Sequence, residues 1–404
     1  MIRDDEFIKI ANDSSSPSFV FDMDALGSRV NEIKNILATG STKPIRLCYS
    51  MKANPFLVGF MSTLADFIEV CSPGELAICK AMNIPGAKII YSGVHKDFED
   101  INEALALGVA EITAESVSQY KLIADCAKKN NYRADVLLRL TSKNQFGMGK
   151  EDIESILDEC GKDNLLTVTG LHYFAGTQRT KLAHQSAELI EITDYIKSLR
   201  ERFHMPLLRL EYGPGAPYPY FVGDDFSDTL LPLKSLMQDL KAAADITGLC
   251  IEMGRFIASE CGYYITAISD VKSSYEHNWC IVDGGINHVN YLGQMMGLKV
   301  PVISHIHAND KDADMPPKDW SVCGSLCTVN DVLVRTLPLK SPKIGDLLVF
   351  KHIGAYSVTE GLNLFLSRNM PKIILYIKGE YHLVRDTVYT WKLNTENNAQ
   401  QNGD

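Results

Sequence analysis

Long apolar runs are missing from this 404-residue sequence, and none approaches the roughly 18 residues that a membrane-spanning helix needs. The N-terminal residues MIRDDEF are charged and have no apolar stretch behind them, so we expect no signal peptide. An excess of positive charge is missing too, because 40 Lys and Arg stand against 50 Asp and Glu, for a net charge of −10. We therefore expect a cytoplasmic protein that binds neither a membrane nor nucleic acid.

Clustered cysteines are missing as well. The ten cysteines are scattered, and the only close pair is Cys323 and Cys327. A zinc site that includes this cysteine pair would need a second pair of cysteines, or histidines at the spacing of zinc ligands. His305 and His307 lie near each other in the sequence, but there is no second cysteine pair, so we expect no metal site. In a chain of this size without an export signal, the thiols are expected to be reduced and mostly buried.

Between residues 24 and 255, short apolar segments alternate with amphipathic helical patterns. Nearly continuous apolar segments bounded by turn residues are typical of parallel strands buried on both faces. The expected strands span residues 45–52, 67–72, 88–93, 110–114, 135–141, 166–175, 207–213 and 249–255. The clearest helical patterns span residues 24–37, 73–82, 97–107, 116–129 and 182–203. Eight strands joined by seven crossovers predict a (β/α)₈ TIM barrel, with an open doubly wound sheet as the alternative.

After residue 255 the pattern changes, and Val, Ile, Tyr and Phe alternate with polar residues between glycine and proline turns. The expected strands span residues 265–269, 280–283, 331–334, 346–350, 372–376 and 382–384. This pattern predicts a C-terminal antiparallel β domain, to which we assign residues 1–23 and 256–393. The polar, low-complexity residues 394–404 predict a disordered tail.

The active site of such a barrel lies at the carboxyl ends of its strands. The candidate residues at these ends are Lys52, Glu69, Phe174, Thr177, Gly213, Gly215, Glu252, Gly254 and Arg255. A lysine at the end of a buried strand suits a Schiff base, because partial desolvation lowers the pKa of its amine. Glycine amides beside an arginine suit a phosphate group. Each residue alone has a simpler explanation, but together they are the parts that pyridoxal phosphate requires.

Six motifs, in order along residues 18–366, resemble those of the fold-type III pyridoxal-phosphate decarboxylases, the family of diaminopimelate, ornithine and arginine decarboxylases. YSMKAN at residues 49–54 resembles the family's Y-x-x-K-A-N motif, and EVCSPGE at 69–75 resembles E-V-A-S-x-G-E. The other four are QFG at 145–147, EMGR at 252–255, CGSLC at 323–327 and GAY at 354–356. Any one of these motifs is weak evidence, but six in family order are strong.

The resemblance implies a role for each candidate residue. Lys52 would carry the internal aldimine, and Glu252 would keep the pyridine nitrogen protonated, so that the ring accepts electrons as a quinonoid forms. The cofactor would also contact Glu69, Phe174, Thr177, Gly213, Gly215, Gly254, Arg255 and Tyr356. Cys327, supplied across a homodimer interface, would protonate the α-carbon.

Departures from the family motifs concern the substrate more than the reaction. Phe174 replaces the histidine that usually stacks on the cofactor, so stacking is kept but a hydrogen bond is lost. Pro214 contributes no amide donor to its turn. Thr328 replaces the acidic residue that usually follows Cys327 and meets a distal amine of the substrate. A free diamine substrate therefore fits poorly, unless Asp331 supplies the missing carboxylate.

The expected function is pyridoxal-phosphate-dependent decarboxylation of an α-amino acid or aminoacyl derivative in a biosynthetic pathway, such as one that makes a secondary metabolite. HYFAGTQ at residues 172–178 resembles the form found in decarboxylases that act on carrier-protein-tethered aminoacyl groups. An amino-acid racemase on the same barrel is the alternative, although racemases place an arginine where this chain has Glu252. A non-enzymatic cofactor carrier is a third possibility, but a lone barrel would need neither the β domain nor Cys327.

Overall fold

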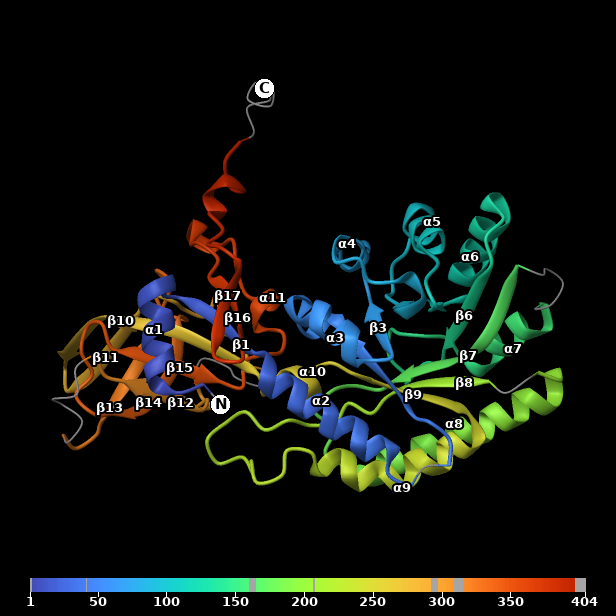
Figure 1. The fold of residues 1–404 in the computed structure, drawn as a ribbon, viewed down its shortest axis with the longest axis horizontal. Coiled ribbons are helices and arrows are strands. Elements are labelled where there is room, and N and C mark those ends of the chain that lie inside the picture. Colours follow the sequence, from blue (N-terminus) through green and yellow to red (C-terminus); the bar gives the residue numbers. More distant parts are fainter. Residues whose placement is uncertain are drawn as a thin grey trace. The chain divides into compact units, whose positions relative to one another are not determined.

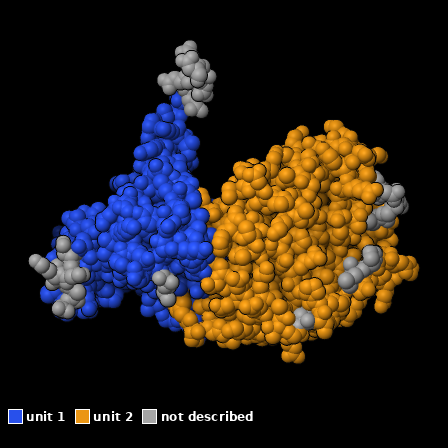
Figure 2. All heavy atoms as spheres, in the orientation of Figure 1, with its two compact units in different colours: residues 1–26, 219–225, 258–404 blue, residues 27–218, 226–257 orange. Residues whose placement is uncertain are grey.

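The computed structural model describes residues 2–40, 42–159, 165–205, 208–291, 297–308 and 315–396. Its contacts divide the chain into two compact units (Figure 2). The barrel unit comprises Gly27–Tyr218 and Phe226–Ile257, and the β unit comprises Met1–Leu26, Pro219–Asp225 and Ala258–Asp404. Of the tail expected at residues 394–404, residues 397–404 lie outside the described part. Within the described part, Asn394 donates a hydrogen bond from its side chain to the carbonyl of Leu364.

Eight parallel strands close into a barrel in sequence order, which confirms the predicted barrel and makes the open-sheet alternative wrong (Figure 1). The strands are β2 (Arg46–Ser50), β3 (Phe67–Val70), β4 (Ile89–Tyr91), β5 (Glu111–Ala114), β6 (Ala134–Arg139), β7 (Leu166–Phe174), β8 (Arg209–Gly213) and β9 (Gly248–Met253). The helices between or before them are α2 (Met23–Ala38), α3 (Val58–Leu64), α4 (Pro73–Ala81), α5 (Phe98–Leu107), α6 (Val117–Asn130), α7 (Lys150–Glu159), α8 (Leu182–Phe203) and α9 (Leu231–Ile246).

Helix starts in the barrel unit follow from local side-chain chemistry. The side chains of Ser72, Asp97 and Ser116 each accept a hydrogen bond from a backbone N–H in the first turn of α4, α5 and α6. Such caps satisfy donors that the helix itself leaves free, so they fix where each helix begins. Helix α5 ends at Gly108, whose φ of 70° lies in the left-handed region that glycine adopts at low cost.

The register of the strands places two of the predicted site residues, Glu69 and Glu252, at the same end of the barrel. Ser50 lies opposite Glu69 in the β2–β3 pair, and Cys48 lies opposite Glu252 in the β2–β9 pair. The interior also holds a cluster of buried residues, which comprises Cys48, Ile90, Leu137 and Cys250 with Phe67 packed against it. Buried charged side chains also lie at the amino ends of the strands, where Arg209 of β8 pairs with Glu111 of β5.

The β unit is built on a nine-stranded sheet with the order β14-β13-β11-β10-β1-β16-β17, while β15 pairs with β10 and β12. Its strands are β1 (Ser18–Asp22), β10 (Gly262–Ser274), β11 (His277–Val282), β12 (Ile303–Ile306), β13 (Lys318–Cys323), β14 (Val332–Leu339), β15 (Leu347–Lys351), β16 (Lys372–Ile377) and β17 (Glu380–Arg385). Most pairs are antiparallel, as predicted, but β1–β16 and β11–β13 are parallel. The helices of the β unit are α1 (Asp4–Ser14) and α11 (Ser357–Glu360), while α10 (Arg255–Ala258) lies mostly in the barrel unit.

Three strands of the β unit were not expected from the sequence, namely β1, β12 and β13. Strand β1 is buried at every position, so it lacks the alternating pattern of a half-exposed strand. Strand β12 has only four residues, and β13 begins with Lys and Asp. One stretch within the range expected for the barrel, Pro219–Asp225, belongs to the β unit because Phe221 bridges to Pro301. Among the described residues, no helix combines the length and apolar character of a membrane span.

Candidate active site

Lys52 occupies the center of a group of buried polar side chains at the carboxyl end of the barrel strands. It lies in the short turn that follows β2. Its Nζ is 3.0 Å from Oε2 of Glu69 and 3.3 Å from Oε1 of Glu252. The lysine side chain is 35% exposed, whereas the two carboxylates are 2% and 4% exposed. One accessible amine is therefore held between two buried acids.

Glu252 is the last residue but one of β9, and its hydrogen-bond and charge partners favour the ionised form of its carboxyl group. Ser50 Oγ donates a hydrogen bond to Oε1 at 2.6 Å, and His172 Nε2 lies 3.0 Å from Oε2. Burial by itself raises the pKa of this carboxyl, but the charge of Lys52 and the hydrogen bond from His172 outweigh it and hold the pKa well below its ordinary value. The carboxylate therefore stays ionised and can stabilise a protonated ring nitrogen.

His172, Ser50 and Cys71 were not among the residues predicted for the site. Cys71 Sγ lies 3.8 Å from Lys52 Nζ, and burial raises the pKa of its thiol well above the ordinary value. A signal for His172 was present in the sequence, because it precedes Phe174 by two positions and alternate residues of a strand face the same side. The same periodicity places Ser50 on the face of Cys48 in β2.

Glycines border the site where side chains would collide with neighbouring backbone or rings. A Cβ at Gly213 would lie 2.5 Å from Phe174 Cδ2, and a Cβ at Gly215 would lie 1.8 Å from the carbonyl oxygen of Gly176. Gly215 also has a φ of 62°, which favours glycine. The Phe174 ring centroid lies 5.8 Å from Lys52 Nζ. The ring and the glycine turn thus lie close together beside the lysine.

Two predicted phosphate-binding side chains also meet within the barrel unit. Arg255 Nε donates a hydrogen bond to Thr177 Oγ1 at 3.2 Å, although the two residues follow different strands. Gly254 lies directly before Arg255, and a Cβ there would lie 2.9 Å from Ala53 Cβ. A guanidinium, a hydroxyl and closely approaching backbone are suitable donors for an anion.

The remaining predicted residues lie in the β unit. Cys327 is exposed and Thr328 is partly buried in the loop that follows β13. Asp331 is 3% exposed, and its carboxylate accepts hydrogen bonds from the backbone N–H groups of Ile286 at 2.8 Å and Leu326 at 2.7 Å. Tyr356 precedes α11 with a φ of 70°. The structure thus brings Lys52, Glu69, Phe174 and Glu252 together in one unit, and Cys327, Thr328 and Asp331 along one loop of the other.

Comparison with known proteins adds a decisive match. The family model described as "Pyridoxal-dependent decarboxylase, pyridoxal binding domain" matches residues 24–259, which are more than half of the chain. The chain belongs to this family. Membership in the pyridoxal-dependent decarboxylases confirms the predicted family, the pyridoxal phosphate cofactor and the general activity, which is amino-acid decarboxylation.

Curated relatives and solved structures are similar along nearly the whole chain. L-glutamyl-[BtrI acyl-carrier protein] decarboxylase of Niallia circulans is 25% identical, over 95% of both chains. 2-[(L-alanin-3-ylcarbamoyl)methyl]-2-hydroxybutanedioate decarboxylase of Staphylococcus aureus is 24% identical, over 88% of this chain and 93% of that protein. The crystal structure of diaminopimelate decarboxylase from Methanocaldococcus jannaschii has a TM-score of 0.84 and 23% identity, and covers 96% of this chain and 93% of its own. These structures confirm the fold of a barrel followed by a β domain.

The described barrel unit fits the cofactor of this pyridoxal-dependent family. The cofactor needs an amine, an ionised carboxylate, an aromatic neighbour and donors for its phosphate. Lys52 and Glu252 supply the first two within 3.3 Å of each other. Phe174 and the glycine turn that crowds its ring supply the aromatic neighbour and the close backbone.

Proposed function

We propose that this protein decarboxylates an α-amino acid or aminoacyl derivative whose side chain bears no free ammonium, with Lys52 as the residue that binds the cofactor covalently. The proposed role of Lys52 rests on the position of its Nζ, which lies 3.0 Å from Glu69 Oε2 and 3.3 Å from Glu252 Oε1. The lysine is accessible enough to meet a cofactor and is surrounded by the charges that keep it in place.

Each remaining barrel residue would hold or orient the cofactor. When bound, pyridoxal phosphate supplies an electron-poor ring that accepts the electron pair left by departing CO₂. The ionised Glu252 would keep a proton on the ring nitrogen, and His172 and Ser50 would each orient one of its oxygens. The residues that would bind the phosphate are Thr177, Gly213, Gly215, Gly254, Arg255 and Tyr356, while Glu69 and Phe174 would line the cofactor.

Cys327 would donate the proton that replaces CO₂ on the α-carbon, and it would act in the site of a second subunit. Its exposure in the single chain is in keeping with a role completed by a partner. The β unit also exposes apolar side chains that a second copy of the chain would cover, namely Leu364, Phe365, Leu366, Leu383, Val384, Tyr389, Trp391 and Leu393. Exposed apolar side chains that gather into one patch are typical of an interaction surface. We therefore propose a homodimer.

The substrate proposal rests on the two residues nearest Cys327 that could meet a distal amine. Thr328 is neutral. Asp331 is an acid, but its two oxygens each already accept a backbone N–H, and the side chain is buried. A distal ammonium without a carboxylate partner would lose several kcal/mol on desolvation. This argument favours substrates such as a carrier-linked glutamyl group over diamino acids, although diaminopimelate decarboxylases are also among the relatives.

Release of CO₂ by purified enzyme from a substrate panel tests this proposal. The panel contains glutamate free and carrier-linked, together with ornithine, lysine and diaminopimelate. We expect poor kcat/KM for the three diamino acids, and a Thr328→Glu variant should improve at least one of them by tenfold or more. Thr328→Gln, which is similar in size but neutral, should not. Efficient turnover of a diamino acid by the wild type would contradict the substrate proposal, and racemisation without CO₂ release would contradict the reaction.

A further inference from the structure

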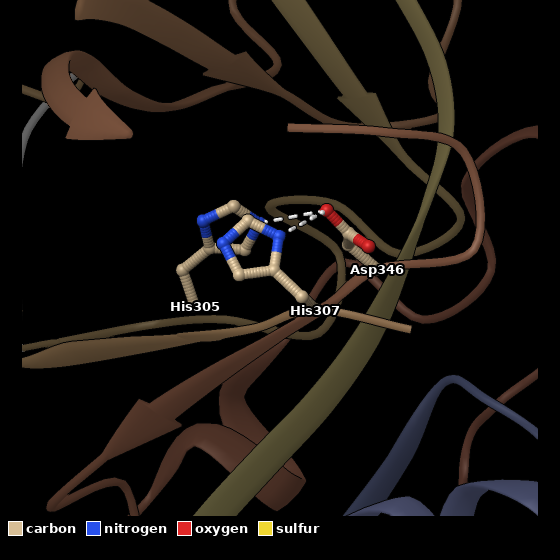
Figure 3. Close-up of side chains that lie close together, drawn as sticks. All are labelled: His305, His307 and Asp346. Carbon is tan, nitrogen blue, oxygen red and sulfur yellow. Dashed lines mark hydrogen bonds and ion pairs between the residues drawn. The ribbon is translucent and has the colours of Figure 1, made fainter. Parts of the chain in front are cut away.

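Two histidines and an aspartate of the β unit converge at the end of a strand pair (Figure 3). His305 lies in β12, His307 follows that strand directly, and Asp346 directly precedes β15. Strands β12 and β15 are antiparallel, with Ile306 opposite Leu347. Because alternate residues of an extended chain face the same side, both imidazoles point toward the carboxylate. Antiparallel pairing thus joins two segments that are remote in sequence.

The distances among the three side chains are close to those of a metal site. His305 Nε2 is 2.9 Å and His307 Nδ1 is 3.3 Å from Asp346 Oδ2, and the ring centroids of the histidines are 4.2 Å apart. All three possible ligand atoms lie within 4.8 Å of one another. Tetrahedral Zn²⁺, with bonds of about 2.0–2.2 Å, keeps its ligand atoms roughly 3.3 Å apart. Only small movements would therefore be needed to place an ion among them.

Backbone groups around the cluster orient its carboxylate. Backbone N–H groups of Ala308 and Lys343 donate to the two oxygens of Asp346 at 2.9 and 3.0 Å. These bonds fix the orientation of the carboxylate, as the hydrogen bonds around a metal ligand commonly do.

We propose that His305, His307 and Asp346 bind one divalent transition-metal ion of the Zn²⁺ type, with water in the fourth position. Two imidazole nitrogens and one carboxylate oxygen suit Zn²⁺, which accepts both ligand types. The side chains of both histidines are only about one-tenth exposed, at 11% and 12%. The site lies in the β unit, outside residues 24–259, which match the model of the pyridoxal binding domain. It also revises the expectation of no metal, which considered cysteine pairs and missed the remote Asp346.

A second group with ligand-like spacing lies in the barrel unit and serves as a contrast. Glu69, His172 and Glu252 also bring their donor atoms within 4.8 Å of one another. There, however, the Lys52 ammonium contacts both carboxylates and already supplies the positive charge. No comparable cation contacts Asp346 among the interactions described for it, which are with His305, His307 and two backbone amides.

The test is metal analysis and Zn²⁺ titration of the holoenzyme, purified without a polyhistidine tag. After chelation and dialysis, we expect one equivalent of Zn²⁺ to bind per chain, and Co²⁺ in its place to give the visible absorption of a tetrahedral site. His305→Ala and His307→Ala should each weaken Zn²⁺ binding at least tenfold, as should Asp346→Asn, which keeps an oxygen for one of the two backbone amides. His184→Ala, at an exposed histidine of α8, is the matched control and should bind as the wild type does.

Thermal unfolding provides a second readout that does not depend on activity. Zn²⁺ should raise the Tm of the wild type and of His184→Ala, but not that of His307→Ala, because a ligand that binds the folded state stabilises it. Absence of saturable Zn²⁺ binding by the wild type would overturn the proposal. Equal weakening in His184→Ala and in the three ligand variants would overturn it as well. Bound cofactor, measured by its absorbance, should stay constant in every variant, since the proposed ligands belong to a different site.

Discussion

His172 Nε2 lies 3.0 Å from Glu252 Oε2, and the other ring nitrogen of His172 has no hydrogen-bond partner among the described residues. The histidine is buried, at 1% exposure, so its one polar contact is with the carboxylate that would face the cofactor ring. We infer that His172 is a positioning residue, which would act on the cofactor through Glu252.

Replacing His172 with Gln should lower kcat by about ten- to a hundredfold, because a buried hydrogen bond to a charged group contributes roughly 1.5–3 kcal/mol. The pH at which the absorbance of the bound cofactor changes should also shift, since Glu252 would hold the ring proton less firmly. Steady-state assays and pH-dependent spectra measure both effects. His184→Gln is the control, and unchanged spectra in His172→Gln would show that the histidine is structural only.

Glu252→Gln removes the negative charge but keeps a side chain of the same shape. We expect a loss of about a hundred- to a thousandfold in the rate of CO₂ release, the magnitude typical of removing one preorganised electrostatic contact. Cofactor affinity, measured by titration of the apoenzyme, should change far less because the phosphate contacts remain. A near-normal rate would mean that another group holds the ring nitrogen.

Subunit mixing tests the proposed origin of Cys327. Lys52→Ala and Cys327→Ala proteins should each be inactive, and their mixture should recover up to about a quarter of the wild-type activity, because half of the dimers would be hybrids with one intact site. The measurement is CO₂ release after verified subunit exchange. If activity does not return, Cys327 acts within its own chain or has no part in the reaction.

Stability should depend on His288 at mildly acidic pH. Burial lowers the pKa of this histidine to about 4, from an ordinary value of 6.5, and the ring is bonded to Tyr264 and Asn287. The unfolded state therefore binds the proton more readily between these values, so the contribution of His288 is present above pH 6.5 and is lost as the pH falls toward 4. We expect about 3 kcal/mol less free energy of unfolding over this interval.

Denaturant unfolding of the wild type and of His288→Gln at several pH values measures how the free energy of unfolding of each protein depends on pH. The variant should lose less free energy of unfolding between pH 6.5 and 4, whatever its stability at neutral pH. Parallel pH dependence in the two proteins would contradict a buried neutral His288.

The barrel could be predicted from the sequence because strands buried on both faces produce apolar segments with clear turn residues between them. The starts of α4, α5 and α6 also depend on nearby residues only. Ser72, Asp97 and Ser116 each accept a hydrogen bond from the backbone amide three residues further along the chain. Lys52 and Glu252 were predicted because each lies in a motif at a strand end. Local patterns thus identified the strands and the two main charged groups.

Contacts that depend on closure of the fold could not be predicted in this way. His172 and Glu252 come from β7 and β9, which are not neighbours in the barrel, so no local pattern links them. Asp346 meets His305 and His307 only because β12 pairs with β15, and β12 was itself too short to be recognised. The hydrogen bonds from Ile286 N–H and Leu326 N–H to the Asp331 carboxylate could not be predicted either, because they depend on how the loop folds.

Borohydride reduction of the holoenzyme, followed by peptide mapping, tests the central claim most directly. Lys96 is the informative competitor, because burial lowers its pKa to about 8 and it lies between β4 and β5 of the same barrel. Its Nζ, however, donates to Gly93 O, Thr113 O and Gln119 Oε1, and an ammonium held by three acceptors has no lone pair with which to attack an aldehyde. We predict that the cofactor is fixed to the peptide that contains Lys52, and that Lys52→Ala retains none after reduction. Cofactor fixed to Lys96, or to any lysine other than Lys52, would contradict the account.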